Sequence, residues 1–251
     1  MLRRRRRVLV LSLLAVATLL VGVDLARGTP QAPRPAPAES YRAGDAPVVE
    51  DVAGPRGTAT TSAGRAVPAT GKGTFTVAPG GTAVAGRGQL LRYEVRVEDG
   101  IGEQPTVFAT AVDATLRDPR SWTGGGEWAF QRISQGDPDF VVTLASPATV
   151  DKLCFPLQTQ GYTSCRVGNT VVVNLARWLL AVPEFHGDLA TYRPYVVNHE
   201  VGHRLSKGHL ACPGPGKLAP VMQQQTLGLK GCKPNAWPYV NGTLVTGQPV
   251  S

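Results

Sequence analysis

Short segments of alternating or continuous apolar residues recur between residues 74 and 173. The clearest segment runs from Leu90 to Glu98, where alternate side chains are apolar, and it predicts a strand with one buried face. The same criteria predict strands at residues 74–77, 128–133 and 140–144. Residues 154–174 predict a hairpin, with its turn near Gly161 and its return strand at residues 170–173. Several strands of this kind predict a sheet.

Two other segments have the spacing of amphipathic helices. Apolar residues at positions 108, 109, 112 and 116 predict a helix over residues 104–116, which Asp118 and Pro119 end. A second helix is predicted after Asp188, because aspartate is a favoured N-cap residue. Pro194 falls in its first turns and either kinks the helix or moves its start towards Arg193.

The second helix carries the candidate chemistry. His199, Glu200 and His203 form an HExxH motif, and His209 follows six residues after His203. On a helix His199 and His203 share a face, so two imidazoles can point at one metal ion. Neutral imidazole is a good ligand for zinc, which prefers a tetrahedral set of N, S or O atoms. Glu200 lies beside that face and could take a proton from a zinc-bound water.

His209 can reach the same ion only if the chain reverses direction after His203. A continuing helix would carry His209 about 9 Å beyond His203 and off the shared face. Gly208 lies where such a turn is needed. The alternative interpretation is a surface ion pair between Glu200 and Arg204, with incidental histidines.

The motif resembles that of the metzincin zinc endopeptidases, in which a tight turn containing methionine follows the third ligand. Met222 follows His209 by thirteen residues. The short interval, with Cys212 before Met222 and Cys232 after it, is most similar to the small secreted proteases of the snapalysin type. It is also similar to a family of uncharacterised secreted bacterial proteins that are predicted metallopeptidases. The snapalysin group usually has aspartate where this chain has His209.

The resemblance implies an α+β fold with a twisted mixed sheet, a backing helix and an active-site helix. A small irregular C-terminal subdomain would follow, and its Met-turn would place Met222 beneath the histidines. Val197, Val201 and Leu205 lie on the helix side opposite the histidines, which fits a helix seated on a sheet.

Ser206 stands where metzincins usually have a glycine that ends the helix. That backbone position needs a positive φ, which glycine adopts without steric penalty. A residue other than glycine in the left-handed region costs roughly 1–2 kcal/mol. Because the ligand spacing is unchanged, we predict that Ser206 bears this strain and that the reversal has not moved to Gly208.

The chain has four cysteines, all in its C-terminal half. An even number outside the cytoplasm suggests two disulfides, for which three pairings exist. The simplest pairing is local, Cys154 with Cys165 and Cys212 with Cys232. In the chain-entropy model each bond would stabilise the fold by about 3 kcal/mol. The first bond would then staple the predicted hairpin. A zinc site made of cysteines is the alternative, but the spacings contain no CxxC.

The N-terminal segment accounts for much of the positive charge. The 251-residue chain has a net charge of +8, and five of its 26 basic residues are Arg3 to Arg7. The rest of the chain has a net charge of +3 and no basic patch interleaved with aromatic residues. It gives no reason to expect nucleic-acid binding. An apolar run from Val8 to Val23 follows the arginines and predicts a signal peptide or a signal anchor.

Both interpretations export the rest of the chain, and we favour an uncleaved anchor with the C-terminal domain outside the cytoplasm. Cleavage would instead give a secreted protein. Residues 27–70 are rich in Pro, Ala and Gly and predict a disordered linker. The predicted organisation is therefore a targeting segment at 1–26, a linker at 27–70 and a catalytic domain at 71–251.

We thus expect an extracytoplasmic zinc endopeptidase in which His199, His203 and His209 hold Zn²⁺ and Glu200 activates the water. Its expected partners are a peptide or protein substrate and, through the N-terminal segment, the membrane; we expect a monomer. One alternative is a zinc-binding envelope protein without turnover. Another is a zinc amidase acting on cell-wall peptide, which ligand spacing does not distinguish from a protease.

Overall fold

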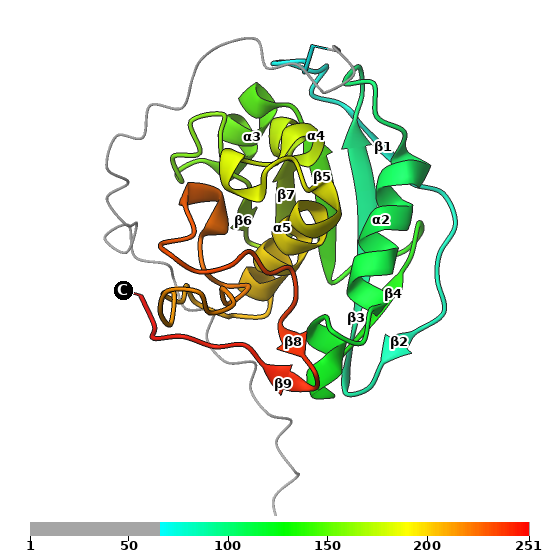
Figure 1. Cartoon of the computed structure of the whole chain (residues 1–251). Coiled ribbons are helices and arrows are strands. Elements are labelled where there is room, and N and C mark those ends of the chain that lie inside the picture. Colours follow the sequence, from blue (N-terminus) through cyan, green and yellow to red (C-terminus); the bar gives the residue numbers. More distant parts are fainter. Residues whose placement is uncertain (1–65, 251) are drawn as a thin grey trace, which may run out of the picture. The chain divides into compact units, whose positions relative to one another are not determined.

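The computed structural model describes residues 66–250, which Figure 1 shows in colour. Seven strands of this part of the chain form one twisted mixed sheet in the order β2-β4-β3-β5-β7-β6, and β1 pairs with the C-terminal half of β3. The strands are β1 (Phe75–Val77), β2 (Ala85–Gly86), β3 (Gln89–Glu98), β4 (Trp128–Arg132), β5 (Phe140–Ala145), β6 (Cys165–Val167) and β7 (Thr170–Asn174). The pairs β3–β4, β3–β5 and β5–β7 are parallel, whereas β6 runs antiparallel to β7 at one edge.

Helices cover the two faces of this sheet unequally. The α-helices are α2 (Pro105–Arg117), α3 (Pro147–Cys154), α4 (Leu175–Leu180) and α5 (Leu189–Arg204). Three short 3-10 helices lie at Trp122–Gly125, Pro183–Phe185 and Gln225–Leu227. The main core contains residues of α2, α4 and α5 together with one face of the sheet. A smaller core joins α3 to the other face of β7 and β6.

The register of the central strands explains why α5 seats on them. Val95, Val142 and Val171 are paired across β3, β5 and β7, and all three are fully buried. Val197 and Val201 of α5 are buried in the same core, as expected for the side of the helix opposite the histidines. The α+β class and the mixed sheet are therefore confirmed. The predicted strands that became β1, β3, β4 and β5, and the helix that became α2, are also confirmed.

The predicted hairpin over residues 154–174 is wrong in its first half. The hairpin consists of β6 and β7 alone, with its turn at residues 168–169, and Cys154 lies at the end of α3. Pro147 is the first residue of that helix, where its fixed φ suits the first turn and its missing N–H costs nothing. The sequence pattern gave no element for residues 147–153, so the helix that ends at Cys154 was not predicted.

Both local disulfide pairings are confirmed, Cys154 with Cys165 and Cys212 with Cys232. The first bond joins the end of α3 to the edge strand β6, and it does not staple the hairpin as predicted. The second lies in the irregular region after α5, where β8 (Tyr239–Val240) and β9 (Thr243–Leu244) pair with each other. This region agrees with the predicted irregular C-terminal part.

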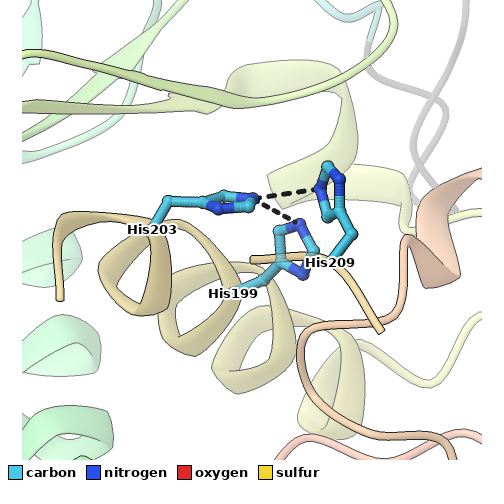
Figure 2. A group of neighbouring side chains, drawn as sticks. All are labelled: His199, His203 and His209. Carbon is cyan, nitrogen blue, oxygen red and sulfur yellow. Dashed lines mark hydrogen bonds between the residues drawn. The ribbon is translucent and has the colours of Figure 1, made fainter. Parts of the chain in front are cut away.

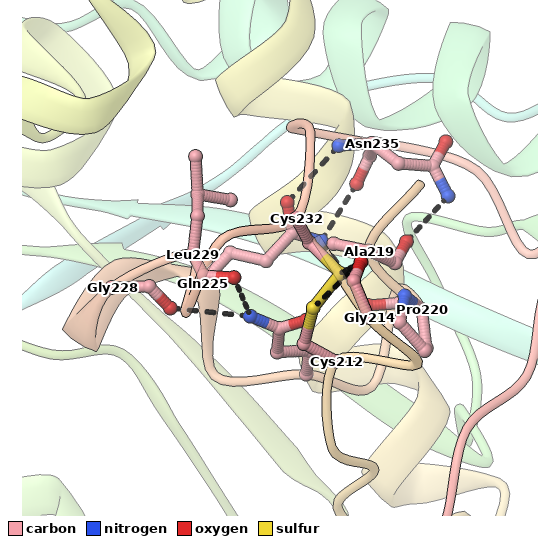
Figure 3. The surroundings of a disulfide bond; sticks show 10 residues. Cys212, Gly214, Ala219, Pro220, Gln225, Gly228, Leu229, Cys232 and Asn235 are labelled. Carbon is pink, nitrogen blue, oxygen red and sulfur yellow. Dashed lines mark hydrogen bonds between the residues drawn. A yellow bond between two sulfur atoms is a disulfide. The ribbon is translucent and has the colours of Figure 1, made fainter. Parts of the chain in front are cut away.

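Side-chain amides hold the loops around the second disulfide together (Figure 3). Gln225 donates to the carbonyls of Pro220 and Asn235, and its own carbonyl accepts from the Asn235 backbone N–H. The Asn235 side chain in turn donates to the carbonyl of Ala219. Both amide side chains are buried, so backbone groups that no helix or sheet satisfies find partners here.

The predicted single-pass membrane location is corrected by the structure. A spanning helix needs roughly 17–25 predominantly apolar residues. No helix within residues 66–250 is long and apolar enough to cross a membrane. The predicted signal segment at 1–26 and nearly all of the predicted linker at 27–70 lie outside the described residues.

Glu98 forms a buried polar contact between β3 and the start of α3. One carboxylate oxygen accepts hydrogen bonds from the Gly73 N–H and the Thr149 hydroxyl, and the other accepts from the N–H and hydroxyl of Ser146. Burial raises the pKa of Glu98, but these hydrogen bonds outweigh it and place the pKa below its ordinary value.

We expect Glu98→Gln to lower the free energy of unfolding at pH 7 by about 2 kcal/mol, because an amide must turn its NH₂ towards one set of donors. The carboxylate stabilises the fold above its ordinary pKa of 4.5, and this contribution is lost as the pH falls through the lower folded-state pKa. Urea unfolding from pH 7 to pH 3 would measure the difference, which should shrink below pH 4.5. Glu94→Gln on the same strand is the control. An equal loss in both variants at pH 7 would contradict this role of Glu98.

Candidate metal centre

Helix α5 begins and ends at positions that its sequence explains. The Asp188 side chain caps the first turn by accepting from the Thr191 N–H. Pro194 lies inside the helix, which starts at Leu189. The predicted alternative, a helix whose start is moved towards Arg193, is therefore wrong.

The C-terminus of α5 is a Schellman motif with Ser206 at the left-handed position. The Lys207 N–H donates to the Gly202 carbonyl and the Ser206 N–H donates to the His203 carbonyl. Ser206 has φ 60°, whereas Gly208 is not among the residues with positive φ. The prediction that the reversal occurs at Ser206 is confirmed. The turn directs the chain back so that His209 returns to the helix.

Figure 2 shows the three histidines pointing at one another. Nε2 of His203 lies 3.2 Å from Nε2 of His199 and 3.1 Å from Nε2 of His209. The His199 side chain is buried, and those of His203 and His209 are partly exposed. The three residues form a group that could hold a metal ion.

Two backbone carbonyls fix how the first two rings present their nitrogens. Nδ1 of His199 lies 2.8 Å from the Val221 carbonyl oxygen, and Nδ1 of His203 lies 3.0 Å from that of Lys207. A carbonyl only accepts, so each Nδ1 must carry the proton. In the neutral rings both Nε2 atoms then have lone pairs and no hydrogen. The 3.2 Å contact between them cannot be a hydrogen bond, and a shared cation would resolve it.

The protonation state and the spacing both suit zinc. Burial lowers the pKa of His199, of His203 (to about 3) and of His209, so the neutral rings that bind metals are favoured. Tetrahedral zinc with Zn–N bonds of about 2.0–2.1 Å holds two ligand nitrogens about 3.3 Å apart. The observed 3.1 and 3.2 Å are close to this value. Three ligands leave a fourth position, which is reachable because two of the rings are partly exposed.

Glu200 is a buried carboxyl group beside the histidines. Burial raises its pKa to about 8, and the positive charge of Arg166 opposes this shift. No hydrogen bond or ion pair to the Glu200 side chain is present among residues 66–250. The alternative interpretation, a surface pair with Arg204, is therefore wrong: Glu200 is buried and Arg204 donates to the Asp139 carbonyl.

The turn that contains Met222 supports the site through its backbone. Besides the Val221 contact to His199, the Met222 carbonyl accepts from the Leu210 N–H, next to His209. The Met222 side chain is buried and its sulfur lies directly against Gly202 of α5. A Cβ on Gly202 would clash with that sulfur and with the Trp122 ring, so a larger residue here would displace the Met222 side chain.

The segment with His209 is held from its other side by the C-terminal residues. The Val250 N–H donates to the His209 carbonyl, and the Ala211 N–H donates to the Gln248 carbonyl. His209 thus lies between the Met222 turn and the end of the described chain. No sequence pattern indicated this contact, because it joins backbone groups of two irregular segments.

The structure brings together all of the metal-site residues predicted from the sequence. His199, His203 and His209 converge, while His186 lies outside the group. Sequence reasoning missed the carbonyls of Val221 and Lys207, which orient two of the rings, because a carbonyl leaves no signal in the identity of its residue.

We expect Ser206→Gly to raise the melting temperature by about 2–4 °C, because it relieves roughly 1 kcal/mol of left-handed strain in a domain of this size. It should also slow the transfer of bound metal to a chelator, since the turn delivers His209. Gly208→Ala is the matched control and should be tolerated: Gly208 lacks a positive φ, and an added Cβ would meet nothing within 4 Å. A neutral Ser206→Gly together with a strongly destabilising Gly208→Ala would contradict this assignment. Differential scanning calorimetry would measure the temperatures.

Comparison with known proteins gives a family but no activity. The family model described as "Protein of unknown function (DUF3152)" matches residues 61–233, which include the three histidines, Glu200, Met222 and the four cysteines. No curated protein and no solved structure matches the chain.

Proposed function

The chain belongs to the DUF3152 family of proteins of unknown function, and we propose that it is a zinc-dependent endopeptidase of the metzincin type that acts outside the cytoplasm. One observation carries the proposal: three imidazole nitrogens face a common point, and two of them have their lone pairs fixed by backbone carbonyls. A buried carboxyl group lies next to the first ligand in the sequence. This combination is the one that a hydrolytic zinc site needs.

Each residue has a distinct role in this proposal. His199, His203 and His209 would hold the ion. When bound, zinc would lower the pKa of a water molecule and polarise the carbonyl of the peptide bond. Glu200 would take the proton from the attacking water and pass it to the leaving amine. Its burial supports this role, because a carboxyl group with a raised pKa both accepts and returns a proton near neutral pH.

Two further features support the metzincin type. The helix ends directly after the second histidine, so the third histidine comes from the returning chain. The turn with Met222 lies against the helix at Gly202 and holds both His199 and the His209 segment by its carbonyls. The choice of a peptide bond as substrate rests on this resemblance.

The extracytoplasmic location is supported by the disulfides. All four cysteines of the chain are paired. Such bonds form and persist in oxidising compartments and are rare in the cytosol.

The full-length protein should contain about one zinc per chain. It should hydrolyse casein, lose this activity in a chelator and regain it with added zinc. Metal analysis and release of labelled casein peptides would measure both. A protein that holds zinc and cleaves neither casein nor cell-wall peptide would be a non-catalytic zinc-binding protein. Cleavage of cell-wall peptide alone would make it an amidase.

A further inference from the structure

Two arginines, Arg166 of β6 and Arg204 of α5, lie at the side of the histidine group. Arg166 is paired with Val171, whose side chain lies in the main core beneath α5. Paired residues on neighbouring strands share a face, so Arg166 points from the edge of the sheet towards α5. Its neighbour Cys165 points to the other face, where α3 lies.

On α5, Arg204 lies one turn after Glu200 and next to His203. Residues four apart share a helix face, so Arg204 and Glu200 lie on one side of α5, and α5 packs against β6. The charge of Arg166 acts on this same group of residues. Burial has the largest effect on each group; the charge of Arg166 opposes the raised pKa of Glu200 and adds to the lowered pKa values of His203 and Arg204.

Each guanidinium group has a buried donor without an acceptor, although that of Arg204 also lies over the Phe140 ring, 6.0 Å from its centroid. The Nε atoms of Arg166 and Arg204 are buried and have no hydrogen-bond partner among residues 66–250. Their side-chain hydrogen bonds go to backbone carbonyls, from Arg166 to Gly168 at 3.5 Å and from Arg204 to Asp139 at 3.0 Å. In the same part of the chain neither arginine forms an ion pair with a carboxylate.

No acidic group within residues 66–250 forms an ion pair with either arginine. The charge of Asp139 acts favourably on Arg204, but the Asp139 carboxylate accepts the Arg92 N–H, and it is the Asp139 backbone carbonyl that accepts from Arg204. The charge of Arg166 acts on Glu200, which forms no ion pair with it. Two like charges with unused donors beside a candidate catalytic centre are unfavourable unless an anion joins them.

We propose that Arg166 and Arg204 form a subsite that binds a carboxylate of the substrate, next to the bond to be cleaved. This inference rests on the proposed function, because it takes the bound ligand to be a substrate. The binding itself does not require turnover. A guanidinium is suited to the task because its planar fork of donors matches the two oxygens of a carboxylate. The carboxylate is either the C-terminus of a short peptide or an aspartate or glutamate side chain.

Binding of dansylated peptides to the full-length, zinc-loaded protein tests this subsite. All variants would be made in a Glu200→Gln background, so that no peptide is cleaved and binding is measured whether or not the parent is a peptidase. The probes are hexa-alanine with a free C-terminus, its C-terminal amide, and the amide with one central alanine replaced by glutamate or by glutamine. Fluorescence anisotropy gives each dissociation constant.

The background protein should bind at least one carboxylate peptide roughly ten-fold more tightly than its neutral counterpart, as expected for a charge-assisted hydrogen bond in a half-buried site. The pair of probes that shows the difference identifies the source, a C-terminus or a side chain. Arg166→Gln and Arg204→Gln should each reduce the preference to about two-fold or less. Arg166→Lys should keep part of it, because the charge remains without the fork.

Arg87→Gln is the control, since Arg87 is exposed and follows β2 at the opposite edge of the sheet. It should keep the full preference, and zinc content and melting temperature should be the same in all the variants. Equal affinity for carboxylate and neutral peptides in the background protein would overturn the proposal. So would a preference that survives both Arg166→Gln and Arg204→Gln, or one that Arg87→Gln removes equally.

Discussion

Glu200→Gln is expected to lower the rate of casein hydrolysis by roughly 10²–10⁴-fold, the usual contribution of a general base. Zinc content should stay the same, because Glu200 is not one of the three residues that converge. Glutamine has nearly the same shape but cannot accept the proton of the attacking water. The buried position argues for a small effect on stability, since an uncharged side chain replaces a carboxyl group whose burial disfavours ionisation. The rate and the metal content would be measured on the same preparation.

Glu184→Gln is the matched control, because Glu184 is exposed in a 3-10 helix before α5. It should hydrolyse casein at the parent rate. A fully active Glu200→Gln variant would remove the proposed mechanism and leave the zinc site in place. Equal losses in both variants would point to damage to the fold.

The second large effect is expected from His209→Ala, which should weaken zinc binding by more than about 100-fold. Loss of a group that merely orients a ligand already costs about 10–100-fold in affinity, and here the ligand itself is removed. Competition with a chromophoric chelator would give the dissociation constants. Cobalt substitution would report the coordination, because loss of one imidazole changes the visible spectrum of a tetrahedral site.

His186→Ala provides the control within the same chain. His186 is the fourth histidine, and it lies on the surface outside the converging group. Its removal should leave zinc affinity unchanged. If His209→Ala also bound zinc as tightly as the parent, the third ligand would be assigned incorrectly and the turn at Ser206 would have a purely structural role.

The sequence alone determined the features that arise from near neighbours along the chain. Alternation of side chains in β3 and the apolar spacing in α2 are local, so each element was predicted within a residue or two. His199 and His203 share a helix face by spacing alone. The positive φ at Ser206 also followed from the chain, because three ligands at fixed spacing leave little room for the reversal.

Tertiary structure decided every feature that depends on which segments meet. The apolar residues after Pro147 suit a helix or a strand, and packing of α3 on the outer face of the sheet selected the helix. The carbonyls of Val221 and Lys207 orient the ligands through backbone atoms, which no residue type reveals. Arg166 acts on Arg204 only because the edge strand β6 lies against α5, since the two residues are far apart in the sequence. Contacts of this kind depend on the three-dimensional path of the chain, and periodicity describes only its local part.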